Sequence, residues 1–190
     1  QSIADDTYEQ CTAFEWIDSA ITVNEAGAGE PSDAECAIYA TPSATTVAVG
    51  DTVTVDFTIR GTEAGLNPGG TGILNVSIPV TWDKNILEYQ SYEIPVLPEG
   101  WIDYVTEANA AAAKDAGYLL LDASDDNGMY YTEDQCFVFR MTFKAIAAGT
   151  SAIDIGGEEQ SIADDTYEQC TAFEWIDAAI TVSAGTTPDP

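Results

Sequence analysis

The residues of this sequence that could do chemistry are mainly carboxylates, and one run of them has the spacing of a calcium loop. Oxygen-bearing side chains stand at positions 1, 3, 5 and 12 of an EF-hand-like pattern: Asp122, Ser124, Asp126 and Glu133. However, Asn127 stands where that pattern needs its turn glycine, and the flanking residues have the pattern of strands rather than helices. The run is more typical of a loop between two strands, and we expect no metal site.

The composition of the chain gives little support to nucleophilic catalysis. The chain has no histidine, which removes Ser-His-Asp and Cys-His systems and most zinc sites. Four cysteines occur without any CxxC pattern: Cys11, Cys36, Cys136 and Cys170. Either one disulfide or buried free thiols would fit them. Acidic residues are so abundant that no pair stands out for glycoside hydrolysis, so we expect the chain not to be an enzyme.

The charge of the chain is strongly one-sided. It has 33 acidic residues against five basic ones, a formal net charge of −28. Such a charge repels phosphate backbones and anionic lipid surfaces, which excludes nucleic acid as a partner. No run of 18 or more apolar residues occurs, so we expect no membrane span.

A long repeat sets the organisation of the chain. Residues 1–23 and 160–182 are identical except that Ser19 corresponds to Ala178, and the offset is 159 residues. This predicts a tandem array in which 1–23 is the tail of a preceding module. Small and polar residues then make 24–35 a linker, 36–182 is one complete module, and 183–190 begins the next linker.

The elements that must position the candidate residues are strands. Apolar residues recur at every second position in Thr52–Ile59, Ile73–Trp82 and Cys136–Lys144. Further strand candidates are Ala37–Val49, Ile86–Ile94, Trp101–Thr106, Gly117–Asp122, Ser151–Ile155 and Ala178–Val182. About nine strands separated by turn residues predict an all-β, two-sheet sandwich.

One segment has a different composition from the strands. Glu107–Ala116 is rich in alanine, which favours helix, and Gly117 suits a helix end. We expect a short helical insert between two strands.

Four segments, in this order, resemble the cohesin modules of cellulosome scaffoldins: Thr46–Val55, Trp82–Tyr89, Phe139–Thr150 and Trp175–Val182. They look like the family's first turn with the strand after it, its aromatic-Asp-x-x-x-Leu-Glu turn, its eighth strand with the following loop, and its last strand. The resemblance covers about residues 37–182 and implies a nine-stranded jelly-roll sandwich.

The resemblance also implies a function. Cohesins are extracellular, secreted or attached to the cell surface, and assemble polysaccharide-degrading complexes. One sheet face, built from the third, fifth, sixth and eighth strands, binds a dockerin module on an enzyme or another scaffoldin. The dockerin brings the calcium, so we expect no cofactor in this chain.

Candidate contacts on the third strand are Asn75 and Ser77. Asn75 falls where the family often has Asn, and Ser77 stands where many members have Asp. Both could bond a partner helix, although a solvated strand face would look the same. They also spell Asn-Val-Ser, a glycosylation acceptor pattern.

On the strand that resembles the eighth, Arg140 points away from Phe139 and Met141. It could pair with a partner carboxylate, with Val138 and Thr142 as neighbouring contacts. A cross-strand ion pair within the chain is the alternative.

The sixth strand carries three consecutive leucines, so at least one points outward unless both faces are buried. We expect Leu119 and Leu121 to form the apolar centre of the interface. The rim and the fifth strand supply the remaining candidates: Ser124, Asp125, Met129, Tyr130, Tyr104 and Thr106.

The duplicated tail suggests a second kind of contact. Residues 1–23 could pair with an exposed sheet edge or exchange with residues 160–182 of another molecule. The alternative is a leftover segment without contacts.

Two other functions remain open beside dockerin binding. A carbohydrate-binding module would need two or three exposed coplanar aromatics, whereas Trp82 lies in a core-facing register and Trp101 stands alone. A structural cell-surface repeat would have no partner beyond its own kind.

Overall fold

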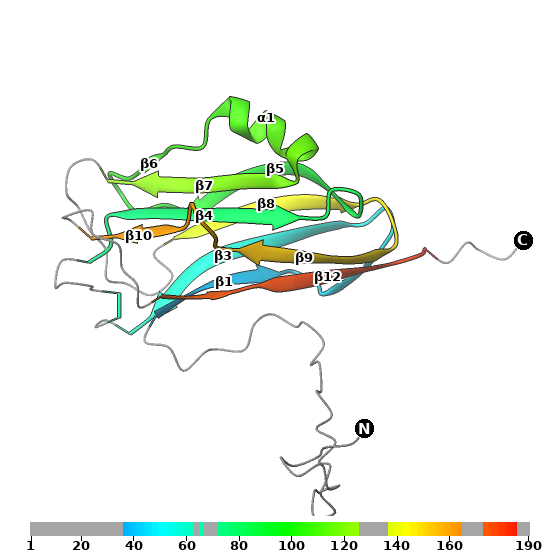
Figure 1. The fold of residues 1–190 in the computed structure, drawn as a ribbon, viewed down its shortest axis with the longest axis horizontal. Helices are drawn as coiled ribbons and strands as arrows, with labels where there is room; N and C mark the ends of the chain where they lie inside the picture. The colour runs from blue at the N-terminus through cyan, green and yellow to red at the C-terminus, as the bar shows by residue number, and fades with distance from the viewer. Residues whose placement is uncertain (1–35, 63–64, 67–71, 126–136, 165–172, 186–190) are drawn as a thin grey trace, which may run out of the picture.

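A computed structural model of the chain describes residues 36–62, 65–66, 72–125, 137–164 and 173–185. They form strands β1 to β12 and one helix, and the strands lie in two sheets that face each other (Figure 1). The predicted sandwich with a helical insert is confirmed. There are more strands than the expected nine, because short pairings such as β2 (Thr46–Ala48) and β6 (Ile102–Asp103) also form.

The first sheet has five strands in the order β11-β1-β3-β8-β5. Their bounds are β1 Cys36–Pro42, β3 Thr52–Gly61, β5 Leu87–Val96, β8 Val138–Ala145 and β11 Phe173–Ile176. β11 pairs with β1 in parallel, and the other pairs are antiparallel. This sheet therefore brings Phe173–Ile176 beside the first described strand.

The second sheet has seven strands, in the order β2-β12-β9-β4-β7-β6 with β10 also paired to β4. The bounds not yet given are β4 Asn75–Trp82, β7 Tyr118–Ser124, β9 Gly149–Ile155, β10 Ser161–Ala163 and β12 Ala178–Ser183. β4 pairs with β9 near its C-terminal end and with β10 near its N-terminal end. β4 thus lies between β9 and β7, and β7 lies between β4 and the edge strand β6.

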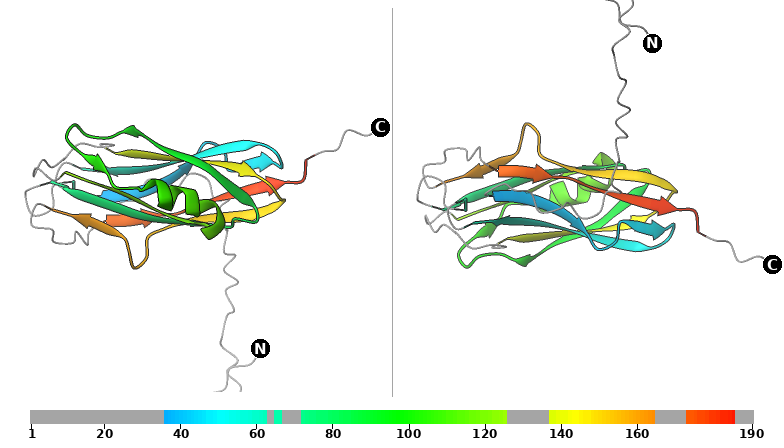
Figure 2. Two further views of the ribbon diagram at one scale, coloured as in Figure 1. Left: turned by 90° about the horizontal axis from the view of Figure 1, so that it is seen from above. Right: turned by 90° about the horizontal axis from the view of Figure 1, so that it is seen from below.

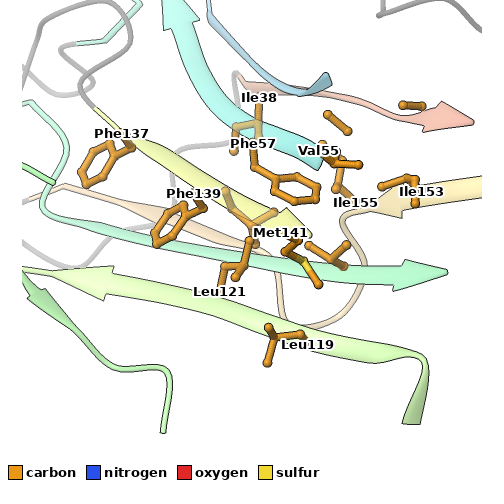
Figure 3. Close-up of a cluster of buried hydrophobic side chains, with 14 of the residues drawn as sticks. Ile38, Val55, Phe57, Leu119, Leu121, Phe137, Phe139, Met141, Ile153 and Ile155 are labelled. Atoms are coloured by element: carbon orange, nitrogen blue, oxygen red, sulfur yellow. The ribbon is translucent and has the colours of Figure 1, made fainter. Parts of the chain in front are cut away.

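The core between the sheets follows from the alternation in the sequence. Five fully buried side chains from both sheets lie close together in the core (Figure 3): Val55 and Phe57 of β3, Phe139 and Met141 of β8, and Leu121 of β7. Burying the apolar side of every strand removes these side chains from water, which is the main favourable term in folding. The predicted inward faces of β3, β4 and β8 are confirmed.

Helix α1 (Glu107–Ala116) begins and ends where the sequence indicated. Thr106 Oγ1 accepts a hydrogen bond from Asn109 N at 3.1 Å, and Gly117 ends the helix in the left-handed region with φ 68°. The helix packs on β7 and β5, one strand of each sheet, and so lies over one side of the sandwich (Figure 2). No helix among the described residues is long and apolar enough to cross a membrane.

Candidate functional site

The outer face of the second sheet is the candidate site. Val76, Ile78 and Val80 point into the core, so the alternate residues of β4 point outward, and β7 and β6 follow the same rule. We call this surface the β4–β7 face; its residues are Asn75, Ser77, Thr81, Ile102, Tyr104, Tyr118, Leu120 and Asp122.

The expected interface leucines are the wrong ones. Leu119 and Leu121 are 1% and 0% exposed and belong to the core, whereas Leu120 is half-buried on the outer face. The period of two fixes this phase, because Leu120 alternates with Asp122, a carboxylate that would not face an apolar core. The polarity of Asp122 was thus the signal in the sequence that could have identified Leu120.

The expected contacts on the eighth strand lie in the other sheet. Val138, Arg140 and Thr142 belong to β8, which pairs with β3 and β5, so they cannot share a face with Asn75. The strand beside β4 is instead β9. The expectation failed because alternation shows which side of a strand is apolar but not which strands become neighbours.

Arg140 takes the alternative role, a cross-strand ion pair. Its Nε and Nη2 donate to the two carboxylate oxygens of Asp56 at 2.6 and 2.8 Å, and its Nη1 lies 3.4 Å from Glu93 Oε1. The hydrogen bond and charge of Asp56 raise the pKa of Arg140 above its usual value. The guanidinium therefore links β3, β8 and β5 on the outside of the first sheet.

The structure places the remaining candidates, from the rim and the fifth strand, in different surroundings. Ser124 lies on the same side of the sheet as Asn75, with which it pairs, but it is only 9% exposed, as Ser77 is. Asp125 is fully buried, and its N donates to Leu74 O at 3.1 Å. Tyr104 is 41% exposed beside β6, as expected, and Thr106 is exposed but caps α1. Met129 and Tyr130 lie outside the described residues.

The loop with calcium-like spacing is described only in part, since Asp126, Asn127 and Glu133 lie outside the described residues. The Asp122 side chain is engaged in hydrogen bonds on the β4–β7 face. Within the described ranges, no three His, Cys, Asp or Glu side chains are grouped so that they could hold a metal ion. Cys36 is buried at the start of β1, and the other three cysteines also fall outside those ranges.

Hydrogen bonds hold the polar part of the face in place. Ser77 Oγ donates to Asp122 Oδ1 at 2.9 Å, and Asn75 Nδ2 donates to the same oxygen at 3.4 Å. Ser161 Oγ of β10 donates to Asn75 Oδ1 at 3.2 Å. The structure thus brings together the two predicted residues Asn75 and Ser77, and it orients their side chains before any partner arrives.

A groove of about 210 Å³ runs between α1 and β7. Its lining residues are Asn109, Ala112, Ala113, Ala116, Tyr118, Leu119, Leu120 and Glu159. The Tyr118 hydroxyl donates to Glu159, and burial together with this carboxylate raises the pKa of Tyr118 to about 12. Small alanine side chains make one wall, which leaves space for an inserted side chain.

The charge on the two sheets is unequal. None of the five basic residues of the chain, Arg60, Lys84, Lys114, Arg140 and Lys144, belongs to a strand of the second sheet. Asp122, Asp154 and Glu159 lie on or beside its outer surface. The β4–β7 face therefore has Asp122 as its one charged residue, with Asp154 and Glu159 beside it, and an apolar part at Leu120, Ile102 and Tyr104.

This sandwich, with its helical insert and its mixed apolar and acidic face, has the fold of cohesin modules. The seventh ScaB type I cohesin from Pseudobacteroides cellulosolvens matches it with a TM-score of 0.57 at 16% identity, covering 82% of this chain and 96% of that chain. The resemblance found in the sequence is confirmed at the level of the fold.

Two further matches are cohesins solved as complexes. The sixth cohesin of scaffoldin B from Acetivibrio cellulolyticus, bound to a mutant Cel5 dockerin, has a TM-score of 0.56 at 17% identity and covers 77% of this chain and 99% of that chain. A type I complex of the OlpA cohesin from Clostridium thermocellum has a TM-score of 0.54 at 12% identity, covering 78% and 99%. No protein-family model and no curated protein sequence matches the chain.

Proposed function

We propose that this chain is a non-catalytic scaffold module that binds a dockerin through its β4–β7 face. It would thereby hold an enzyme or another scaffoldin in a polysaccharide-degrading complex outside the cell. The observation that carries the proposal is the fold, which is shared with cohesins solved in complex with dockerins. The sequences of this chain and those cohesins are 12–17% identical, and a shared fold alone does not imply a shared function, so dockerin binding is proposed here and tested below.

The β4–β7 face has the anatomy of an interface. Ile102 and Tyr104 are 43% and 41% exposed, and with Leu120 they form an apolar part. The Asn75–Ser77–Asp122 hydrogen bonds lie beside it. Protein–protein interfaces usually combine an apolar part with fixed polar groups, and here the apolar part lies toward the edge strand β6 while the polar groups lie on β4 and β7. The outer face of the first sheet instead carries the ion pairs of Arg140.

The acidic charge favours a partner with lysine or arginine at its contact surface. Complementary charges speed association and fix orientation. Calcium enters the proposal only as part of the dockerin, whose fold would depend on it. Removing calcium should accordingly abolish binding without changing the stability of this chain.

Sugar binding is the second candidate, and the described aromatics give it little support. Trp82 and Trp101 are buried, and Trp175 is half-buried in β11. Among the described residues, Tyr104 is the large aromatic that stands exposed. A flat platform needs two or three such rings side by side, so we place dockerin binding first.

The test is calorimetric titration of the full chain with a panel of dockerins, first with calcium and then with chelator. The face is tested with Ile102→Asp, which puts a charge into the apolar part. Val96→Asp is the matched control, because Val96 is also 43% exposed but belongs to β5 of the first sheet.

We expect calcium-dependent binding to one group of dockerins. Ile102→Asp should weaken it at least about tenfold, because it puts a charge into the apolar part of the interface, and Val96→Asp should change it less than about twofold. Equal losses in both variants would refute the β4–β7 face. Absence of binding to every dockerin, with retention on cellulose, would put the carbohydrate-binding function first.

A further inference from the structure

The β4–β7 face continues into the groove between α1 and β7. Tyr118 and Leu120 belong to both surfaces, because they are residues of the face and also line the groove. Among the described residues, β6 pairs with β7 at Ala123 and Ser124, and α1 borders the earlier residues of β7 at the groove. A partner that covers the face would therefore also meet the groove.

The charged group of the groove comes from the side opposite to α1. Glu159 lies in the turn between β9 and β10, which stands out from the outer face of the second sheet (Figure 2). Three hydrogen bonds hold this turn: Gly156 N donates to Pro79 O at 3.2 Å, Gly157 N to Gln160 Oε1 at 2.9 Å, and Gln160 N to Gly157 O at 3.2 Å. The turn thus presents Glu159 to the groove from the side of β4.

The carboxylate of Glu159 can still accept a donor from a partner. Tyr118 Oη donates to Glu159 Oε2, and Oε1 has no hydrogen-bond or ion-pair partner among the residues that the structure describes. None of the five basic residues of the chain lines the groove. The two that lie nearest to α1 are engaged elsewhere, since Lys114 pairs with Glu88 at 3.0 Å and Lys84 Nζ donates to a backbone carbonyl at the end of α1. The charge of Glu159 is therefore left without a cation from the chain itself.

The rest of the lining suits the aliphatic part of a side chain. Ala112 and Ala116 of α1 and Leu120 of β7 supply apolar walls, and Asn109 adds a side-chain oxygen that can accept a hydrogen bond. A space of about 210 Å³ between them has the size of one long side chain rather than of a helix or a strand. The groove therefore has room for one side chain with an apolar stem and a polar end.

Lysine is the side chain that fits these features best. Its stem can lie on apolar surface while the ammonium reaches polar groups at the end. The ammonium has three donors, which can meet Glu159 Oε1, Asn109 Oδ1 and Tyr118 Oη. Arginine fits less well, because its planar fork suits a carboxylate with both oxygens available, and the Tyr118 hydroxyl already uses one of them.

We propose that the groove between α1 and β7 binds one lysine side chain of the partner, with the stem against Ala112, Ala116 and Leu120 and the ammonium at Glu159. The proposal rests on the proposed function, since the dockerin supplies the lysine. It adds a specific pocket at the edge of the β4–β7 face, and this pocket selects among dockerins by the residue that reaches it.

The first experiment tests the groove without a dockerin. The full chain is titrated with N-acetyl-lysine methylamide, a blocked lysine, and its amide chemical shifts are followed by NMR. Blocked norleucine, which has the same aliphatic stem without the ammonium, and blocked arginine are the comparisons. We expect saturable shifts at Ala112, Ala116 and Leu120 with blocked lysine at millimolar concentration, and none with blocked norleucine. Glu159→Gln should weaken the binding of blocked lysine at least about fivefold.

Blocked lysine that gives no saturable shift, or that binds the Glu159→Gln chain equally well, would overturn the lysine site. Tighter binding of blocked arginine than of blocked lysine would overturn the choice of lysine.

The second experiment uses a dockerin that binds the chain and two pairs of matched variants. Glu159→Gln removes the charge but keeps an acceptor for Tyr118, and Glu158→Gln removes the same charge one residue away, outside the lining. Ala112→Leu fills the groove, and Ala111→Leu makes the same change at an exposed position of α1 that does not line it. We expect Glu159→Gln and Ala112→Leu each to weaken binding about tenfold, and each control to change it less than about twofold.

The outcomes separate this proposal from the proposed function. If a dockerin binds and neither groove variant loses more than its control, the lysine pocket is wrong while dockerin binding stands. If no dockerin binds, the proposed function is wrong, and the blocked-lysine titration alone decides on the groove. Shifts that Glu159→Gln removes would then retain it as a lysine site, and the absence of shifts would overturn it.

Discussion

The three consecutive leucines of β7 separate stability from recognition at the scale of single residues. Leu119 and Leu121 are core residues, whereas Leu120 shares the outer face with Tyr118 and Asp122. Neighbouring residues of identical chemistry thus have different roles, because successive side chains of a strand point to opposite faces.

This difference can be measured with two alanine substitutions on the same strand. Leu121→Ala should lower the free energy of unfolding by about 2–4 kcal/mol, because it leaves a cavity in the core. Leu120→Ala should cost less than about 1 kcal/mol, yet weaken binding of the proposed dockerin. Urea unfolding and calorimetric titration check the two effects, and comparable destabilisation by both substitutions would contradict the burial of β7.

At the scale of elements, helix α1 covers one side of the sandwich, where β7 and β5 lie. It lies on one strand of each sheet and makes a wall of the groove over β7. Its ends are fixed by Thr106 and by Gly117, where an added Cβ would lie 3.0 Å from Trp82 O. The left-handed φ of Gly117 adds a second reason for glycine.

The N-terminal cap of α1 gives a local prediction. Thr106→Ala removes the acceptor for Asn109 N and should cost about 1 kcal/mol. Thr106→Ser keeps a hydroxyl at the same place and should retain most of that stability. Hydrogen exchange of the amides in α1 should become faster in the alanine variant and not in the serine variant, while the amides of β3 and β8 stay unchanged.

At the scale of the whole molecule, the distribution of charge matters more than its sum. The basic residues lie on the first sheet, on α1 and in the turn after β4, so the strands of the second sheet carry carboxylates, such as Asp122 and Asp154, but no basic residue. Arg140 balances Asp56 and Glu93 on the first sheet, and Lys114 lies 3.0 Å from Glu88 of β5. A basic partner would therefore be attracted toward the second sheet.

That attraction predicts salt dependence of the proposed association. Raising the salt from about 0.05 M to about 0.5 M shortens the screening length severalfold, so the association rate should fall about tenfold or more. The dissociation rate should change much less, because short-range apolar contacts are not screened. Stopped-flow mixing of the chain with a dockerin that it binds measures the association and dissociation rates. An association rate independent of salt would refute electrostatic attraction.

The sequence by itself determined the sandwich, the inward faces of its long strands and the helix. Alternation is a local property, so Phe57, Phe139 and Met141 could be assigned to the core before any pairing was known. Alanine and Gly117 fixed α1 in the same local way. Four short segments were enough to find the cohesin resemblance, which the fold confirms.

The tertiary structure alone decided which strands became neighbours. β8 and β4 both alternate, yet β8 lies between β3 and β5, and β9 takes the place beside β4. This removed Val138, Arg140 and Thr142 from the candidate face and brought Glu159 beside α1. Pairing joins residues far apart in the chain, so it depends on how all the strands pack together rather than on the pattern of any one of them.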